Sequence, residues 1–462
     1  MTYAWGLLAS AIPVGVGAVL LFRAGLYGHM HVALFVGVAY GLGLALISFV
    51  LVILPVLGIP LTLLWALPSV GLAWGALWFA TGRFSKHVES VPASTPASAR
   101  GLWMRAVWAV GLALLVAKLG LIGVRAMDKP VIGWDAVTTH SLRAKAMYYD
   151  QTIARSSLDW IGSADYPLGL PLLELWVNWF QGRWDDTAFK ILFPGFLAAL
   201  LAMLYGALRE VVRPLGSLFG AWFAASLPLL VEHATDAYLD LPLAYTTLGT
   251  SIFLWRHART REAHDLLLAS AMAAFGVWIK REGAVAFGIA LALLALWSVI
   301  ARAPVRAKPV STLAAFAAMP ALVWVAWAVF RWTALESAPL SFQPSSVSDF
   351  FSRALAVAAY ASGELWRSSN WNVLWPLFFG VWLFHARRSL DPDILFFTWP
   401  VVLTLAAFLA TSAGTVMFDF LMQGSTLHRM VLHVAPLAAF SVGLMVGRHW
   451  ETIRARAPRA RG

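Results

Sequence analysis

The charged residues with the most suggestive setting lie between two apolar runs, in the segment Trp278-Ile279-Lys280-Arg281-Glu282-Gly283. No turn-rich loop separates the runs. If the runs cross a membrane, charges at their junction are expected to be partnered and functional. An adjacent Lys and Arg suit the binding of a phosphate anion. A salt-bridged tight turn explains the same residues, and the residues alone leave both interpretations open.

Three carboxylates stand near the ends of other apolar runs. Asp135 follows Gly133-Trp134, where it suits either a general base at the membrane surface or a helix N-cap. Asp236 and Asp240 are four residues apart. On a helix they would share a face, and a cation or a proton would have to offset their repulsion. A solvated helix end capped by Asp236 is the alternative.

Further candidates are single residues. Arg429 opens the last apolar run, as a flank charge or as a second phosphate contact. Lys118 lies inside an apolar run, where it either snorkels to the surface or faces a polar cavity. His428 and His433 do not share a helical face, so the spacing does not predict a metal site.

The composition indicates which class of protein holds these residues in place. The chain has 462 residues, of which 60% are hydrophobic and 12% charged, with a mean hydropathy of +0.74. Soluble domains have about 25% charged residues, so a soluble globular enzyme and a disordered chain are both excluded. The absence of Cys excludes disulfides, thiolate catalysis and Cys-based metal sites.

The apolar runs predict about 13 transmembrane helices of roughly 20 residues. Three lie in residues 1–80 and are interpreted as accessory helices. Residues 81–105 are expected to be a cytoplasmic linker, 106–448 the core and 449–462 a basic cytoplasmic tail. The predicted core spans are 106–124, 188–208, 215–231, 241–255, 265–279, 283–300, 310–330, 372–385, 394–411 and 430–447.

The net charge of +11 indicates orientation rather than a partner. Most Lys and Arg fall in one set of alternate loops, which the positive-inside rule places in the cytoplasm together with the C-terminus. No basic run interleaved with aromatics predicts nucleic-acid binding. Two long loops, about 125–187 and 331–371, fall on the outer side. Segments 135–149 and 172–180 of the first are expected to be helices lying on the bilayer.

These features together resemble the GT-C superfamily of integral-membrane glycosyltransferases, similar to bacterial aminoarabinose transferases and protein O-mannosyltransferases. The resemblance covers about residues 105–448. It rests on an ordered set of motifs: Trp134-Asp135, Tyr166-Pro167-Leu168-Gly169, Thr235-Asp236-Ala237-Tyr238-Leu239-Asp240, Lys280-Arg281-Glu282-Gly283, and Arg429 with Pro436. It implies an all-α polytopic membrane protein, a GT-C-like helical bundle with juxtamembrane helices in a long first outer loop.

The resemblance also implies roles. Asp135 and Asp236 match acidic catalytic positions, and Lys280 and Arg281 match the donor-phosphate region. The expected substrate contacts further include Arg429, Tyr166, His140 and Asp240. Asp135 is followed by Ala where many relatives have a second acid. The resemblance leaves a divalent metal ion open, and no cofactor is indicated.

The expected function is inverting transfer of a sugar from a polyprenyl-phosphate-linked donor to a lipid, glycan or protein acceptor at the periplasmic face of a bacterial inner membrane. Such a transfer needs a carboxylate to take the acceptor proton and cations to stabilise the departing phosphate. A transporter or lipid flippase, a polysaccharide polymerase or ligase, and a catalytically silent subunit are the alternatives.

Overall fold

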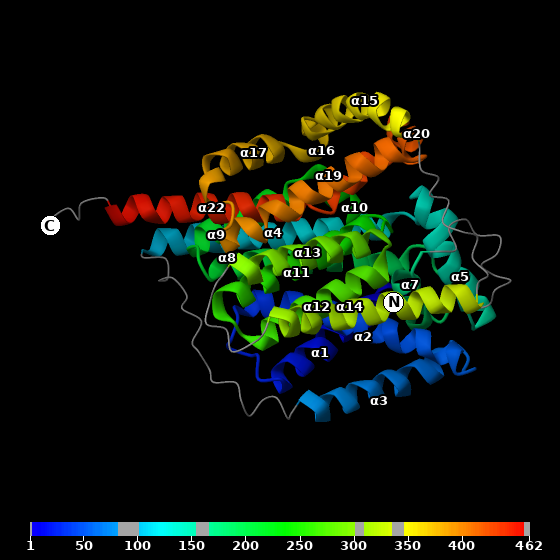
Figure 1. The fold of residues 1–462 in the computed structure, drawn as a ribbon. Coiled ribbons are helices and arrows are strands. Elements are labelled where there is room, and N and C mark those ends of the chain that lie inside the picture. Colours follow the sequence, from blue (N-terminus) through cyan, green and yellow to red (C-terminus); the bar gives the residue numbers. More distant parts are fainter. Residues whose placement is uncertain (1, 82–100, 154–165, 301–308, 335–345, 457–462) are drawn as a thin grey trace.

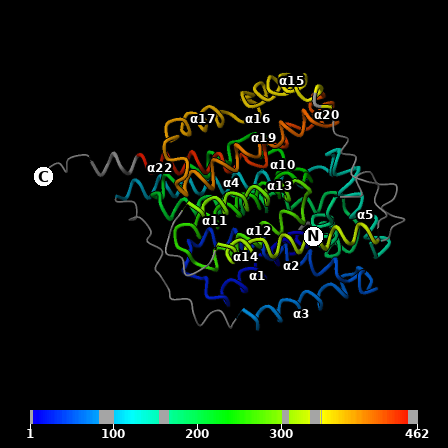
Figure 2. The backbone as a smooth tube through the Cα atoms, viewed as in Figure 1, coloured from blue at the N-terminus to red at the C-terminus, as the bar shows by residue number. Residues whose placement is uncertain are grey.

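The computed structural model describes residues 2–81, 101–153, 166–300, 309–334 and 346–456, and every regular element in them is a helix. The expectation of an all-α polytopic membrane protein is confirmed. Most of the predicted linker and the end of the predicted tail lie outside the described residues. Figures 1 and 2 show the long helices running side by side, with α3 along one side of the bundle and α15 and α17 along the opposite side.

The first three helices are α1 (Thr2–Arg23), α2 (Val32–Val56) and α3 (Leu63–Thr81). A Cβ atom at Gly17 would collide with the backbone of Ala39, and one at Gly43 with the backbone of Pro13. Small residues of this kind allow two membrane helices to approach closely. Helix α2 also packs on α8, and α1 on α7. The accessory role of these helices stays a prediction, but α1 and α2 are packed into the bundle.

The segment after α4 (Leu102–Asp128) contains η2 (Ala136–His140), α5 (Ser141–Asp150) and α7 (Gly169–Gln181). The expectation that residues 172–180 lie on the bilayer is wrong. Every residue from Gly169 to Asn178 is buried, because α1, α2, α5 and α12 surround this helix. The buried residues of α5 include Arg143, Ala144 and Met147, so this helix packs on the rest of the protein through that face.

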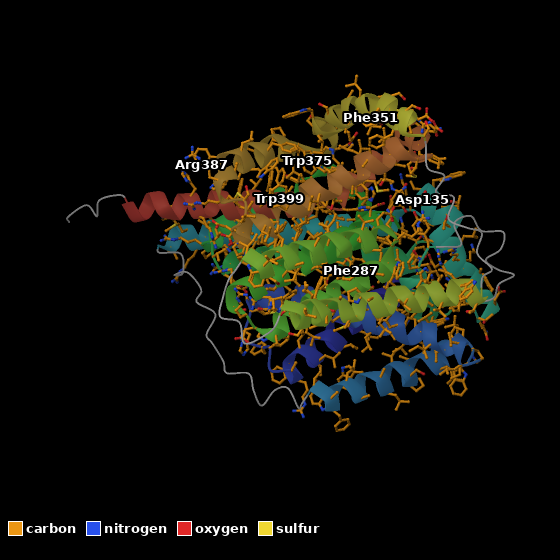
Figure 3. All side chains as sticks on the ribbon, viewed as in Figure 1. Asp135, Phe287, Phe351, Trp375, Arg387 and Trp399 are labelled. Carbon is orange, nitrogen blue, oxygen red and sulfur yellow. The ribbon has the colours of Figure 1, made fainter. Side chains whose placement is uncertain are left out.

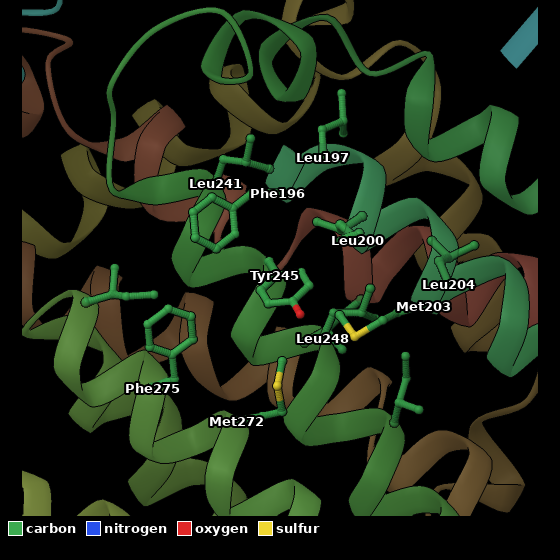
Figure 4. Close-up of a cluster of buried hydrophobic side chains, with 14 of the residues drawn as sticks. Phe196, Leu197, Leu200, Met203, Leu204, Leu241, Tyr245, Leu248, Met272 and Phe275 are labelled. Atoms are coloured by element: carbon green, nitrogen blue, oxygen red, sulfur yellow. The ribbon is translucent and has the colours of Figure 1, made fainter. Parts of the chain in front are cut away.

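The middle of the bundle is built by η3 (Ala188–Ile191), α8 (Leu192–Arg209), α9 (Pro214–Ala225), α10 (Pro228–His233), α11 (Asp240–Thr260), α12 (Ala263–Ile279), α13 (Glu282–Ile300) and α14 (Pro309–Ala334). Figure 4 shows Phe196 of α8, Tyr245 of α11 and Phe275 of α12 meeting in its core. The predicted span 215–231 is not continuous, since the helix ends at Ala225 and a new one starts at Pro228.

The chain ends with a second group of helices: α15 (Val347–Leu365), α16 (Ser368–Trp371), α17 (Leu374–Phe384), η4 (Ala386–Arg388), α18 (Pro392–Leu395), α19 (Thr398–Gly414), α20 (Met417–Met422), α21 (Leu427–Leu432) and α22 (Ala435–Arg456). Helix α22 packs on α9, α11 and α17, which attaches this group to the middle of the bundle.

By length and composition, 8 helices in the described residues are suited to cross a membrane: α1, α2, α3, α4, η3 with α8, α13, α14, and α18 with α19. The other predicted spans coincide with α9, α11, α12, α17 and α22, which are shorter or more polar. A buried helix can be more polar than one that faces lipid, because neighbouring helices satisfy its polar groups.

The bundle has two chemically different ends. Figure 3 shows Asp135 at one end and Arg387 at the other. Helix α11 links them, with Asp240 at its first residue and Arg256 four residues before its last. Arg256 contacts Glu210 and Asp265 and donates to the carbonyl of His29 at 2.9 Å. The end that contains Asp135 and Asp240 is called the site end below.

Candidate active site

A buried carboxylate, that of Asp240, is the centre of the site end. Its Oδ1 lies 2.6 Å from Nζ of Lys280 and 2.8 Å from Nε2 of His433. Its Oδ2 lies 3.0 Å from Nε of Arg429 and 3.7 Å from Nδ1 of His233. Burying a charge is costly unless it is paired and hydrogen-bonded. Two cations and a close histidine therefore supply what Asp240 needs in order to stay ionised.

Arg429 connects this buried centre to Asp135. The guanidinium donates from Nε to Asp240 and from Nη1 to Oδ2 of Asp135, the latter at 2.6 Å. Its planar fork suits two carboxylates at once. The Asp135 side chain is 35% exposed, whereas that of Asp240 is fully buried. Asp135 is thus accessible to a substrate and is held by the same arginine that neutralises Asp240.

Asp135 does not cap its helix in this structure. It precedes η2, has helical backbone angles and makes no side-chain capping hydrogen bond. The capping explanation of this residue is therefore replaced by an ion pair that joins the segment after α4 to α21.

The Asp236–Asp240 pair does not share a helical face. Asp240 begins α11, while the residues from Ala234 to Leu239 form turns, bends and irregular backbone. Asp236 accepts a hydrogen bond from the amide of Ala237 at 2.8 Å and lines a cavity of about 660 Å³. The two carboxylates therefore differ in their surroundings: Asp240 is enclosed by protein, whereas Asp236, which is 8% exposed, lines a cavity.

Lys280 and Arg281 have different surroundings. Lys280 is 2% exposed, and Glu282 lies 3.6 Å from its Nζ, in addition to Asp240. Burial acts to lower the pKa of Lys280, but Asp240 and Glu282 outweigh it and raise the pKa above its usual value. Lys280 is therefore a charged, buried partner. Arg281 is exposed and its guanidinium lies 4.1 Å from the centre of the Tyr166 ring.

Tyr166 and His140 pack together beside these cations, with ring centroids 5.3 Å apart. The carbonyl of Tyr166 accepts a hydrogen bond from Arg143 at 2.9 Å. Burial, followed by the charges of Arg143, Lys280 and Arg429, holds the pKa of His140 well below its usual value. His140 is therefore neutral at physiological pH.

Sequence reasoning did not assign three buried residues to this site. His433 was considered only as half of a metal pair, and His233 and Glu174 were given no role. The carboxylate of Glu174 is fully buried, and burial raises its pKa well above the usual value. These residues reach the site from α21–α22, α10 and α7, and no sequence spacing links those elements.

Metal binding has no structural support in the part of the chain that the structure describes. No group of three or more His, Asp or Glu side chains there is placed to hold a metal ion. The carboxylates at the site end are paired with nitrogen cations or lie apart from one another.

Comparison with known families gives the class of protein. Residues 171–327 match the family model for dolichyl-phosphate-mannose-protein mannosyltransferases. This region contains Asp236, Asp240, Lys280 and Arg281. The match confirms the resemblance of this chain to GT-C type membrane glycosyltransferases. No curated protein and no solved structure matches the chain.

Proposed function

We propose that this protein is an inverting glycosyltransferase that uses a polyprenyl-phosphate-linked sugar as donor. The observation that carries the proposal is the partly exposed carboxylate of Asp135, which Arg429 links to the buried Asp240–Lys280 pair. An accessible base and a fixed group of cations within one site are the two requirements of sugar transfer from a phosphate.

In the proposed reaction, Asp135 takes the proton of an acceptor hydroxyl. The acceptor oxygen forms a bond to the anomeric carbon on the face opposite the phosphate. The bond between that carbon and the phosphate oxygen breaks, and the phosphate leaves with the electron pair. The anomeric configuration is inverted because attack and departure occur on opposite faces.

The cations have two kinds of role in this proposal. Arg281 is exposed and contacts the leaving phosphate, with Tyr166 supporting its guanidinium. Lys280 is buried, so it acts through its field and by fixing Asp240. Arg429 moves from Asp135 toward the phosphate as the donor binds, which releases the carboxylate for proton transfer. Asp236 and His140 stay candidates for contacts with the sugar or acceptor.

The site end is proposed to face the periplasm of a bacterial inner membrane, with the C-terminus in the cytoplasm. Arg387 lies at the end of the bundle opposite Asp135 (Figure 3), in a basic turn with Arg388. Cytoplasmic loops carry an excess of Lys and Arg, which supports this orientation. The acceptor is proposed to be a lipid, a glycan or a protein that presents a hydroxyl at that face.

The test is turnover of the purified full-length chain with a polyprenyl-phosphate sugar and an acceptor-containing membrane extract. Asp135→Asn is expected to lower turnover at least ~100-fold, the usual contribution of a general base. Asp419→Asn, an exposed carboxylate on α20, is the matched control and is expected to keep wild-type turnover. Wild-type turnover by Asp135→Asn would remove Asp135 from the mechanism, and movement of the lipid without bond formation would favour a transporter.

A further inference from the structure

Asp135 lies in a helix that contains one π-helical turn. Asp135 itself is helical, the residues of η2 form the π turn, and α5 continues directly from it. The amide of Ser141 donates to the carbonyl of Ala136, five residues earlier, and this hydrogen bond closes the turn. A turn of this kind adds one residue, so it rotates Asp135 by about 100° relative to α5. Without the π turn, the Asp135 carboxylate would be directed away from Arg429.

The carboxyl group of Glu174 lies beside this turn. Glu174 is on α7, which packs on α5, and its side chain is fully buried. Among the residues that the structure describes, neither the Glu174 oxygens nor the Ser141 hydroxyl make a hydrogen bond of normal geometry. Burial raises the pKa of Glu174 well above its usual value, while the nearby Ser141 hydroxyl acts in the opposite direction. A neutral carboxyl group therefore lies next to a hydroxyl group, and each can donate to the other.

The burial of Glu174 lowers the stability of the fold. The other residues from 170 to 177 are buried and apolar, and a buried polar group that lacks a well-made hydrogen bond is unfavourable among them. Asn178, one turn further along α7, is equally buried but well bonded. Its side-chain amide donates to the carbonyl of Glu174 at 3.2 Å and accepts from the amide of Asp185 at 2.9 Å. A group that lowers stability is typical of a functional site, where the activity depends on it.

We infer that Glu174 is a positioning residue for Asp135. Glu174 holds the hydroxyl of Ser141, whose amide closes the π turn. The turn in this register directs the Asp135 carboxylate toward Arg429. Glu174 does not touch a reacting group, since its effect passes through Ser141. It acts on turnover only if Asp135 is the base, and in that respect the inference rests on the proposed function.

Turnover of Glu174→Leu and Glu174→Gln separates positioning from proton transfer. Leucine has a similar volume but cannot form a hydrogen bond, so Glu174→Leu is expected to lower kcat at least ~10-fold by misplacing the base. Glutamine is neutral and donates from its amide, so Glu174→Gln is expected to keep the wild-type kcat. KM for the polyprenyl-phosphate sugar is expected to stay unchanged in both, because Lys280 and Arg281 are untouched. An equal loss of kcat in both variants, or wild-type kcat in Glu174→Leu, would overturn the inference.

Thermal unfolding of the purified full-length chain in one detergent separates positioning from a structural role. Glu174→Leu breaks no hydrogen bond of normal geometry and is expected to unfold at the wild-type temperature or above it. Asn178→Leu is the matched control on the same helix. It breaks two hydrogen bonds and is expected to unfold at a lower temperature. A lower unfolding temperature for Glu174→Leu would assign this residue to the stability of the bundle and overturn the inference.

A double-mutant cycle measures the positioning without any assay of activity. Asp135→Asn is expected to lower the unfolding temperature of the wild type and of Glu174→Gln, because Arg429 loses a partner. In Glu174→Leu it is expected to change the unfolding temperature little, because the contact with Arg429 is already broken. Additive effects of Asp135→Asn and Glu174→Leu would overturn the inference.

Failure of the proposed function is a separate result. Wild-type turnover by Asp135→Asn would refute the role of Asp135 as the base, whereas the cycle would still report whether Glu174 positions Asp135.

Discussion

Asp240 is the residue on which the arrangement of charges depends. Lys280 and Arg429 both neutralise it, and each has one further carboxylate partner: Glu282 for Lys280 and Asp135 for Arg429. Removing Asp240 would leave two buried or half-buried cations without their shared partner. Removing Lys280 would leave Asp240 with Arg429 and His433. The two substitutions therefore have unequal consequences.

We expect Asp240→Asn to destabilise the protein by about 3–5 kcal/mol, the cost of breaking a buried ion pair by removing one partner. Lys280→Met is expected to cost less, because two partners of Asp240 remain. Thermal unfolding of the purified variants in one detergent measures the order. A larger loss of stability for Lys280→Met than for Asp240→Asn would contradict the central position of Asp240.

The buried side chain of His233 is expected to make the free energy of unfolding depend on pH. Burial, helped by the charges of Arg429, His428 and Lys280 and opposed by that of Asp240, lowers the pKa of His233 from 6.5 to about 3. Below pH 6.5 the unfolded chain binds a proton at this histidine and the folded chain does not. Its contribution to stability is therefore full above pH 6.5 and is lost as the pH falls toward 3.

The expected loss from His233 is about 1.4 kcal/mol on going from pH 7.5 to pH 5.5, because only the last unit lies below its unfolded pKa. Melting curves at the two pH values should differ less for His233→Gln than for wild type. His385→Gln, at the opposite end of the bundle, is the control and should show the wild-type difference. An unchanged difference in His233→Gln would show that this histidine is accessible to protons in the folded state.

At the scale of helices, a close contact between α12 and α13 positions Lys280. A Cβ atom at Gly283 would collide with the backbone carbonyl of Gly276. Gly276 and Gly283 lie on either side of the turn that carries Lys280. Their close contact therefore fixes the position of the Lys280 backbone. The helices can separate only by moving this turn.

Gly283→Ala is therefore expected to lower turnover at least ~10-fold and to lower the unfolding temperature, because the new methyl group pushes α13 away from α12. Gly288→Ala on the same helix is the control, since a Cβ atom there meets nothing within 4 Å. Turnover and thermal unfolding of the two variants give the comparison. Equal behaviour of both would show that the Lys280 turn tolerates the shift.

The sequence predicted helices well and their surroundings poorly. Long uncharged runs such as 32–56 predict spans because the bilayer requires about 20 apolar residues. The burial of α7 was not predictable, because a short apolar helix looks the same whether lipid or protein covers it. The signal in the sequence was a charge next to an apolar run, and it identified Asp135, Asp240, Lys280 and Arg429. Arg429 contacts both Asp135 and Asp240. These contacts join residues at least 189 positions apart in the sequence, and sequence periodicity gives no information about them.

At the scale of the whole molecule, the orientation of the protein in the membrane can be tested with single introduced thiols, because the chain has no Cys of its own. Arg183→Cys places a thiol near the site end, and Ser389→Cys places one beside the Arg387–Arg388 turn. In intact cells freed of their outer membrane, an impermeant maleimide should label Arg183→Cys at once. It should label Ser389→Cys only after the inner membrane is opened. The reverse pattern would place the site end in the cytoplasm.

The burial of α7 also bears on how the chain is made. Gly169, at the start of α7, lies against the backbone of Trp278, near the end of α12. About a hundred residues separate them, and a ribosome adds roughly 5–20 residues per second. During that interval of several seconds α7 has α1, α2 and α5 beside it but lacks one wall. The packing of α7 is therefore complete only after α12 has been synthesised and inserted, so a segment made early is completed by one made late.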